Sequence, residues 1–131
     1  MTEASTDLPV ILVVENVEEI RDGIEKLLNA DGYRVDPAKD EEDAVQRANR
    51  KHPDLILMTS GEHQLEIIET ACRIRERAGL ADRVAVVIFC METVTEGDAV
   101  DIGRNIHLTR PDNFDQLRYF LCRLLQLSHI A

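Results

Sequence analysis

Three short runs of consecutive apolar residues are the feature that most restricts how this chain can fold. They span residues 10–14, 55–58 and 84–90, and Val, Ile and Leu make up the whole of the first. An unbroken apolar run of strand length is typical of a strand that is covered on both faces. Such strands belong to parallel sheets with helices packed on either side, so the sequence predicts an α/β fold.

The segments between these runs carry apolar residues at helical spacing. Gly97 and Gly103 are unfavourable for the helix expected at 93–104. Asp40 is a suitable N-cap for the second helix, and either Asp112 or Asn113 for the last one. We expect helices at about 20–28, 40–48, 62–78, 93–104 and 113–125, and two more strands at 33–35 and 105–108.

Five strands alternating with five helices predict a flavodoxin-like, doubly wound (βα)5 sandwich with a five-stranded parallel sheet in the order 2-1-3-4-5. At 131 residues the chain is one domain, which we place at 9–131 after an N-terminal tail at 1–8. In such sheets the functional site lies at the carboxyl ends of the strands. The residues predicted there are Glu15, Asn16, Thr59, Ser60, Cys90, Met91, Thr109 and Arg110.

Composition excludes several classes of function. The net charge of −10 argues against binding nucleic acid or an anionic membrane surface. The apolar runs are too short to span a bilayer, and residues 1–7 lack the basic start and apolar centre of a signal peptide, so we expect a cytoplasmic protein. The three cysteines, Cys72, Cys90 and Cys122, lack metal-site spacing and are expected to pack as small apolar residues.

Four segments, in their order and spacing, resemble the receiver domains of bacterial two-component response regulators. They are ILVVEN at 11–16, HPDLILM at 52–58, Ile74-Arg75, and LTRP at 108–111. The resemblance covers nearly the whole chain. It implies the doubly wound fold, a role in phosphorelay signal transduction, and partners such as a sensor kinase, another response regulator or a second copy in a homodimer.

The chain departs from the family pattern at the positions that carry its chemistry. Receivers of the family have an acidic pair after the first strand, a phospho-accepting Asp after the third, Thr or Ser after the fourth, and Lys-Pro after the fifth. The matching residues here are Glu15 and Asn16 (acidic pair), Thr59 (phosphoacceptor), Cys90 (hydroxyl), His107 (aromatic switch), and Arg110 with Pro111 (Lys-Pro).

These departures predict a receiver without the usual switch chemistry. Mg²⁺ prefers several anionic oxygen ligands, and Glu15 is one carboxylate where the family has three, so we expect no cofactor and weak or absent Mg²⁺ binding. Thr59 is a poor nucleophile without a base, and Glu15 is the nearby candidate. We expect instead that the Thr59 hydroxyl bonds a neighbouring backbone group or Arg110. The chain is therefore predicted not to be an enzyme.

Two residues near this site have more than one interpretation. Arg110 could hold a phosphate-like anion or form a two-pronged ion pair with Glu15, and we favour the ion pair. His107 could be a pH-sensitive switch or a surface residue at the sheet edge, and we favour the surface residue.

The last predicted helix is apolar beyond one core-facing stripe. Tyr119 and Leu127 lie off that stripe, so either they form an interaction face or Tyr119 lies along the surface and Leu127 covers the terminus. The resemblance points to the face made by the fourth helix, fifth strand and fifth helix.

We predict a phosphorylation-independent protein-interaction module. The alternative is a phosphoreceiver with residual or Ser/Thr-type modification at Thr59 or Ser60. Flavin and cobalamin domains are disfavoured because their loop motifs are missing.

Overall fold

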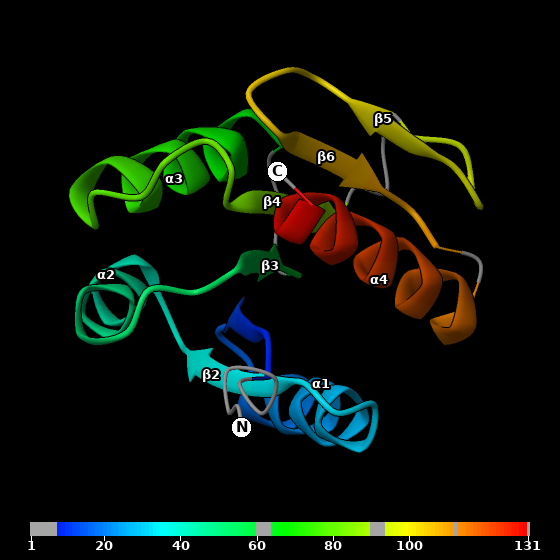
Figure 1. Ribbon diagram of the computed structural model, residues 1–131, viewed down its shortest axis with the longest axis horizontal. Helices are drawn as coiled ribbons and strands as arrows, with labels where there is room; N and C mark the ends of the chain where they lie inside the picture. Colours follow the sequence, from blue (N-terminus) through cyan, green and yellow to red (C-terminus); the bar gives the residue numbers. More distant parts are fainter. Residues whose placement is uncertain (1–7, 60–63, 90–93, 112, 131) are drawn as a thin grey trace.

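The computed structural model describes residues 8–59, 64–89, 94–111 and 113–130 (Figure 1). Strands and helices alternate along most of the chain, as the sequence predicts. In order, the elements are β1 (Val10–Val14), α1 (Glu18–Ala30), β2 (Arg34–Ala38), α2 (Glu41–Arg50), β3 (Leu55–Met58), α3 (Gln64–Arg77), β4 (Ala85–Phe89), β5 (Ala99–Asp101), β6 (Ile106–Thr109) and α4 (Phe114–Ile130). Within the described residues, no helix is both long and apolar enough to cross a bilayer.

The strands form one sheet in the order β2-β1-β3-β4-β6-β5. The pairs that join β2, β1, β3, β4 and β6 are all parallel, and these five strands follow the predicted doubly wound order. The sixth strand, β5, pairs with β6 in the antiparallel direction. Figure 1 shows β2 and β5 at opposite edges of the sheet. The doubly wound prediction is confirmed, but the sheet has one strand more than expected.

The extra strand replaces the helix that we predicted at 93–104. The described part of that segment forms a turn, β5 and a second turn, so the helix prediction is wrong. Gly97 and Gly103 have φ angles of 90° and 98°, and Arg104 and Asn105 also have positive φ. These left-handed conformations are incompatible with a continuing helix and suit tight turns. The three at 103–105 reverse the chain so that Ile102 N–H donates to Ile106 C=O at 3.0 Å.

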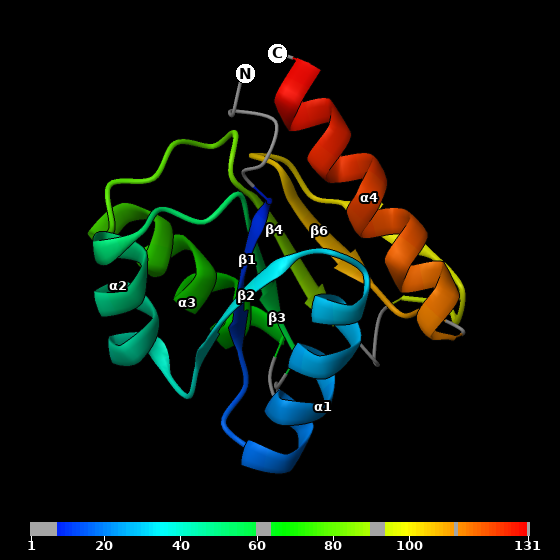
Figure 2. The same cartoon turned by 60° about the horizontal axis from the view of Figure 1, so that its bottom comes forward.

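Helices cover both faces of the sheet. Along β1 the side chains alternate: Ile11 and Val13 belong to a core cluster with α1 and α4, whereas Leu12 and Val14 belong to another with α2 and α3. Figure 2 shows these two pairs of helices on opposite sides of the strands. Two apolar layers therefore cover the central strands, as their unbroken apolar runs predict.

Two of the helix starts have the predicted caps. The Asp40 carboxylate accepts a hydrogen bond from Asp43 N–H at 2.8 Å, and the Asn113 side chain accepts one from Gln116 N–H at 2.9 Å. Each bond satisfies an N–H group that the first helical turn leaves unpaired. Asn113 is thus the cap of α4 within the described chain.

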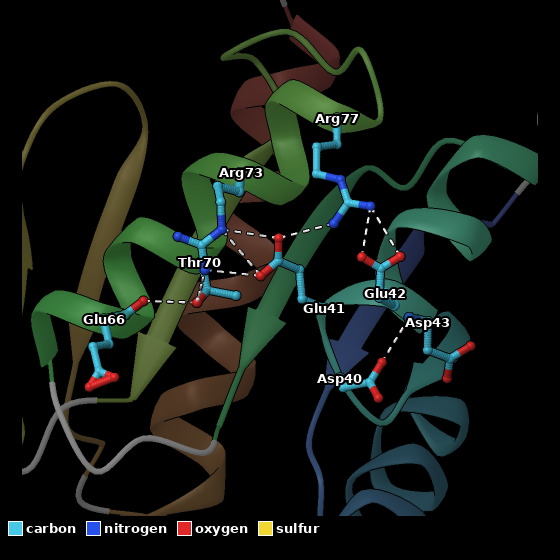
Figure 3. A network of polar contacts seen from close by, with 8 residues as sticks. All are labelled: Asp40, Glu41, Glu42, Asp43, Glu66, Thr70, Arg73 and Arg77. Atoms are coloured by element: carbon cyan, nitrogen blue, oxygen red, sulfur yellow. Dashed lines mark hydrogen bonds and ion pairs between the residues drawn. The ribbon is translucent and has the colours of Figure 1, made fainter.

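An ion-pair network joins α2 to α3 on the surface (Figure 3). The Glu41 carboxylate accepts hydrogen bonds from Arg73 and Arg77 at 2.9–3.2 Å, and Arg77 also pairs with Glu42 at 2.8 Å. The bonds from Arg73 lower the pKa of Glu41 from its ordinary value. Because these groups are partly exposed, the network sets the position of the two helices more than it adds stability.

Candidate functional site

The carboxyl ends of β1 and β3 place two polar residues side by side. Val14 pairs with Met58 at the ends of the two strands, and Glu15 and Thr59 come next in each. Thr59 N–H donates to Val14 C=O at 3.3 Å, which extends the ladder by one step beyond the strands. The parallel register therefore brings the two side chains to the same edge of the sheet, where the sequence predicts the site.

The side chains of Glu15 and Thr59 are hydrogen-bonded to each other. Thr59 Oγ1 donates to Glu15 Oε1 at 2.5 Å, and Glu15 Oε2 accepts a second bond from Val17 N–H at 2.8 Å. The Glu15 residue is only 2% exposed. Each carboxylate oxygen thus already has a donor, as a buried charged group requires. The prediction that Thr59 bonds the backbone or Arg110 is wrong, because its partner is the Glu15 carboxylate.

A cation from α1 also lies at this site, which the sequence reasoning missed. Arg21 Nη1 donates to the backbone C=O of Glu15 at 2.9 Å. The signal was available: Arg21 lies one helical turn inside α1, and the chain between Glu15 and α1 is too short to carry it far away. Asn16, the second residue of the predicted acidic pair, is exposed.

Arg110 does not form the predicted ion pair with Glu15. Its backbone N–H donates to Asp98 C=O at 3.1 Å, and its C=O accepts from Gly97 N–H at 2.6 Å, so it continues the pairing of β6 with the β5 segment. In the described parts of the chain its guanidinium has no ion-pair partner. Burial of Glu15 against Thr59 and Val17 explains the difference, since the carboxylate oxygens are already occupied.

His107 is a buried residue, so the prediction that it lies on the surface at the sheet edge is wrong. It is 9% exposed, because β5 covers the outer side of β6 and α4 covers one face. Its Nε2 lies 2.8 Å from Asn105 Oδ1, and its ring meets Phe120 edge-on with the centroids 5.7 Å apart. Burial lowers the pKa of His107. The ring is therefore neutral at physiological pH.

The remaining predicted positions are exposed, half-buried or outside the residues that the structure describes. Tyr119 is 68% exposed, with the Arg123 guanidinium 5.8 Å from its ring centroid, and Pro111 is half-buried. Ser60, Cys90 and the Leu127 side chain lie outside the described residues. Cys72 and Cys122 are free and half-buried.

The sheet order, the two helical layers and the polar edge at Glu15 and Thr59 together match one family. The family model for the response regulator receiver domain covers residues 11–121. The chain belongs to the response regulator receiver domain family. Its members are signalling domains of two-component systems, and the chain is such a domain.

The individual proteins that the chain resembles share less than a third of its sequence over the matched residues. The transcriptional regulatory protein DltR of Streptococcus agalactiae is 29% identical over 107 residues, which are 82% of this chain and 47% of DltR. The chain thus spans about half the length of the curated relatives it matches. The response regulator TrrA from Thermotoga maritima, solved with Mg²⁺-BeF, is 21% identical with a TM-score of 0.66 and covers 89% of this chain and 99% of TrrA. NtrX from Brucella abortus is 20% identical with a TM-score of 0.70 over 95% of this chain and 28% of NtrX. These two structures support the fold.

Proposed function

We propose that this receiver domain acts by binding other proteins, without aspartyl phosphorylation and without enzymatic activity. The observation that supports this most directly is the Thr59–Glu15 hydrogen bond. By the family resemblance, Thr59 stands at the phosphoacceptor position, and a hydroxyl there replaces the carboxylate that would take the phosphoryl group. Its partner would be a sensor kinase, another response regulator or a second copy.

The donor set does not fit the divalent metal of the family. Mg²⁺ would need several anionic oxygens and room for its remaining waters. Glu15 is 2% exposed, and its two oxygens already accept hydrogen bonds from Thr59 and Val17. Asn16 is a neutral amide, and no group of three or more acidic, His or Cys residues in the described chain is arranged to hold a metal. Mg²⁺ chemistry therefore forms no part of the proposal.

Amide NMR spectra recorded with Mg²⁺ and beryllofluoride test the proposal, with intact mass measured after exposure to a small phosphodonor. We expect neither chemical-shift changes at Glu15, Thr59 and Arg110 nor an added phosphate. Asn16→Asp/Thr59→Asp is the matched control, because it restores the two carboxylates that the family has and this chain lacks, and it should gain a Mg²⁺-dependent response. Changes centred on Glu15, Thr59 and Arg110 in the natural chain, or an added phosphate, would sink the phosphorylation-independent proposal.

One observation favours a second candidate function, modification of the Thr59 hydroxyl. A carboxylate that lies 2.5 Å from this hydroxyl is within reach to act as a base. The Thr59 oxygen would attack the phosphorus of a phosphodonor, the hydroxyl proton would pass to Glu15, and the leaving group of the donor would depart. Mapping phosphate after incubation with a small phosphodonor, and separately with a Ser/Thr kinase, which supplies its own base, distinguishes this function from the first. Thr59→Val should then abolish the modification, whereas phosphate found at Ser60 alone would exclude Thr59.

A further inference from the structure

The segment between β4 and β6 exposes a sheet edge where we had predicted a helix. β5 forms the last position in the sheet, and Figure 1 shows it outside β6, at the opposite edge from β2. All three residues of β5 are exposed. An edge strand presents unpaired backbone groups to any further strand that approaches it.

The hydrogen bonds that β5 makes to β6 identify those groups. Arg110 N–H donates to Asp98 C=O at 3.1 Å, and Ile102 N–H donates to Ile106 C=O at 3.0 Å. In an antiparallel pair, alternate residues point their N–H and C=O toward the partner strand. Residues 98, 100 and 102 therefore face β6, and Ala99 and Asp101 point theirs away from it. The backbone N–H and C=O groups of these two residues therefore point to the open side of the sheet, where the described chain has no further strand.

Two apolar side chains lie beside this backbone edge. Val100 and Ile102 are 44% and 43% exposed, and they point to the same face of the strand because they are two residues apart. Val100 stands opposite Leu108, which is buried in the core cluster with α2 and α3. The exposed pair thus extends the apolar layer of the sheet by one strand. An added strand with alternating apolar side chains would continue it.

The charges around the edge are acidic. Asp101 of β5 and the preceding Glu96 and Asp98 are exposed. Of the nearby bases, Arg104 is paired with Asp82 at 3.4 Å and the half-buried Arg110 lies opposite Asp98, so acids outnumber bases at this edge. Two copies joined through β5 would bring these acids together, and each copy carries a net charge of −10. Like charges at this range oppose self-association. Charge therefore favours a basic partner over a second copy.

We propose that β5 is a docking edge for an extended segment of a partner protein in which basic and apolar residues alternate. The segment would pair with Ala99 and Asp101, place its apolar side chains beside Val100 and Ile102, and place its basic side chains on the opposite face, beside Asp101. This mode of binding adds a strand to a sheet edge. It rests on the proposed function in one respect, which is that the chain works through protein contacts.

The test is titration of the full chain, labelled with ¹⁵N, with a hexapeptide of alternating lysine and valine. A hexapeptide of alternating glutamate and valine is the matched control. We expect the largest shifts at the amides of Ala99 and Asp101, and binding that weakens as salt is raised. The lysine peptide should bind at least tenfold more tightly than the glutamate peptide.

Two variants separate strand addition from simple charge attraction. Ala99→Pro removes an outward N–H without removing a bond to β6, and Val100→Lys places a repelling charge on the apolar pair. Each should weaken binding of the lysine peptide at least tenfold while the amide spectrum of the rest of the domain stays unchanged. Should Ala99→Pro unfold the domain, Val100→Lys alone decides.

Three results would overturn the docking edge. They are shifts centred away from β5, equal binding of the two peptides, and a concentration-dependent dimer that the β5 variants abolish. None of them bears on the Mg²⁺ and beryllofluoride experiment, because Ala99 and Val100 lie away from Glu15 and Thr59. Failure of the docking edge and failure of the proposed function are therefore distinguishable.

Discussion

At the scale of single residues, the hydrogen bond between Thr59 and Glu15 is the central interaction of the polar edge. A carboxylate that is 2% exposed must be hydrogen-bonded, and Thr59 supplies one of its two donors. The same hydroxyl that is a poor substitute for a phosphoacceptor is therefore a good partner for a buried acid. Thr59 has a structural role whether or not it is ever modified.

Replacing Thr59 with Val should destabilise the domain. The variant keeps a β-branched side chain but leaves one oxygen of the buried Glu15 without its donor, which typically costs about 1–3 kcal/mol. Urea unfolding at neutral pH measures the change. Thr59→Ser keeps the hydroxyl and should stay much closer to the natural protein. No loss in Thr59→Val, or a larger loss in Thr59→Ser than in Thr59→Val, would mean that packing of the methyl group outweighs the hydrogen bond.

His107 should make stability fall as the solution is acidified. Burial lowers its pKa below the ordinary value of about 6.5. At pH values between the folded-state pKa and the ordinary pKa, the unfolded chain binds the proton more readily than the folded chain. The free energy of unfolding therefore rises with pH in that range. Below the folded-state pKa, the stability that comes from keeping the buried His107 ring neutral is lost completely. Ring NMR signals should show a midpoint below 6.5, and a midpoint above it would contradict the assignment.

At the scale of elements, the end of α3 is held against β4 by a buried arginine. Arg75 is 1% exposed, and its Nη1 donates to Val84 C=O at 3.1 Å. Nη2 lies 3.7 Å from Asp82 Oδ1, and in the described chain Nε and Nη2 have no hydrogen-bond partner. Burial lowers the pKa of this guanidinium. The arginine thus fills space between the two elements with a charge that is incompletely satisfied.

Arg75→Met should therefore leave stability within about 1 kcal/mol of the natural protein, or raise it, because an apolar side chain of similar length avoids the cost of burying the charge. Arg75→Ala should cost about 2–5 kcal/mol, since it leaves a cavity. Urea midpoints of the two variants give the comparison. A large loss with Met would show that the bond to Val84 C=O outweighs the cost of burial.

The elements also show where sequence patterns are sufficient. Continuous apolar runs predicted β1, β3 and β4, and the carboxyl ends of the first two hold Glu15 and Thr59 as expected. Spacing could not predict β5, because three exposed residues between glycines have no periodicity to measure. The burial of His107 follows from β5, so the two errors have one cause. The partners of Thr59 and Arg110 depend on side-chain directions, which sequence spacing does not fix.

At the scale of the whole molecule, charge affects stability and binding together. A net charge of −10 on a 131-residue chain produces self-repulsion, which dissolved salt screens. Any salt should therefore raise the melting temperature a little, whichever cation it contains. The acids beside β5 contribute to the same field and would attract a basic partner before contact.

Millimolar Mg²⁺ should leave the melting temperature where NaCl of equal ionic strength leaves it. A ligand stabilises a protein by RT ln(1 + [L]/Kd), so about 5 mM Mg²⁺ at a Kd of about 10 mM adds only about 0.2 kcal/mol. Such weak binding is expected because Glu15 is buried and its oxygens are occupied.

Asn16→Asp/Thr59→Asp is again the sharpest comparison for Mg²⁺. It places two carboxylates next to Glu15, whose mutual repulsion a divalent ion would relieve, so its melting temperature should rise with Mg²⁺ well beyond the NaCl control. Scanning calorimetry of both proteins in both salts completes the test. If Mg²⁺ raises the melting temperature of the natural chain as much as that of the variant, its polar edge holds the metal despite the Thr59–Glu15 bond.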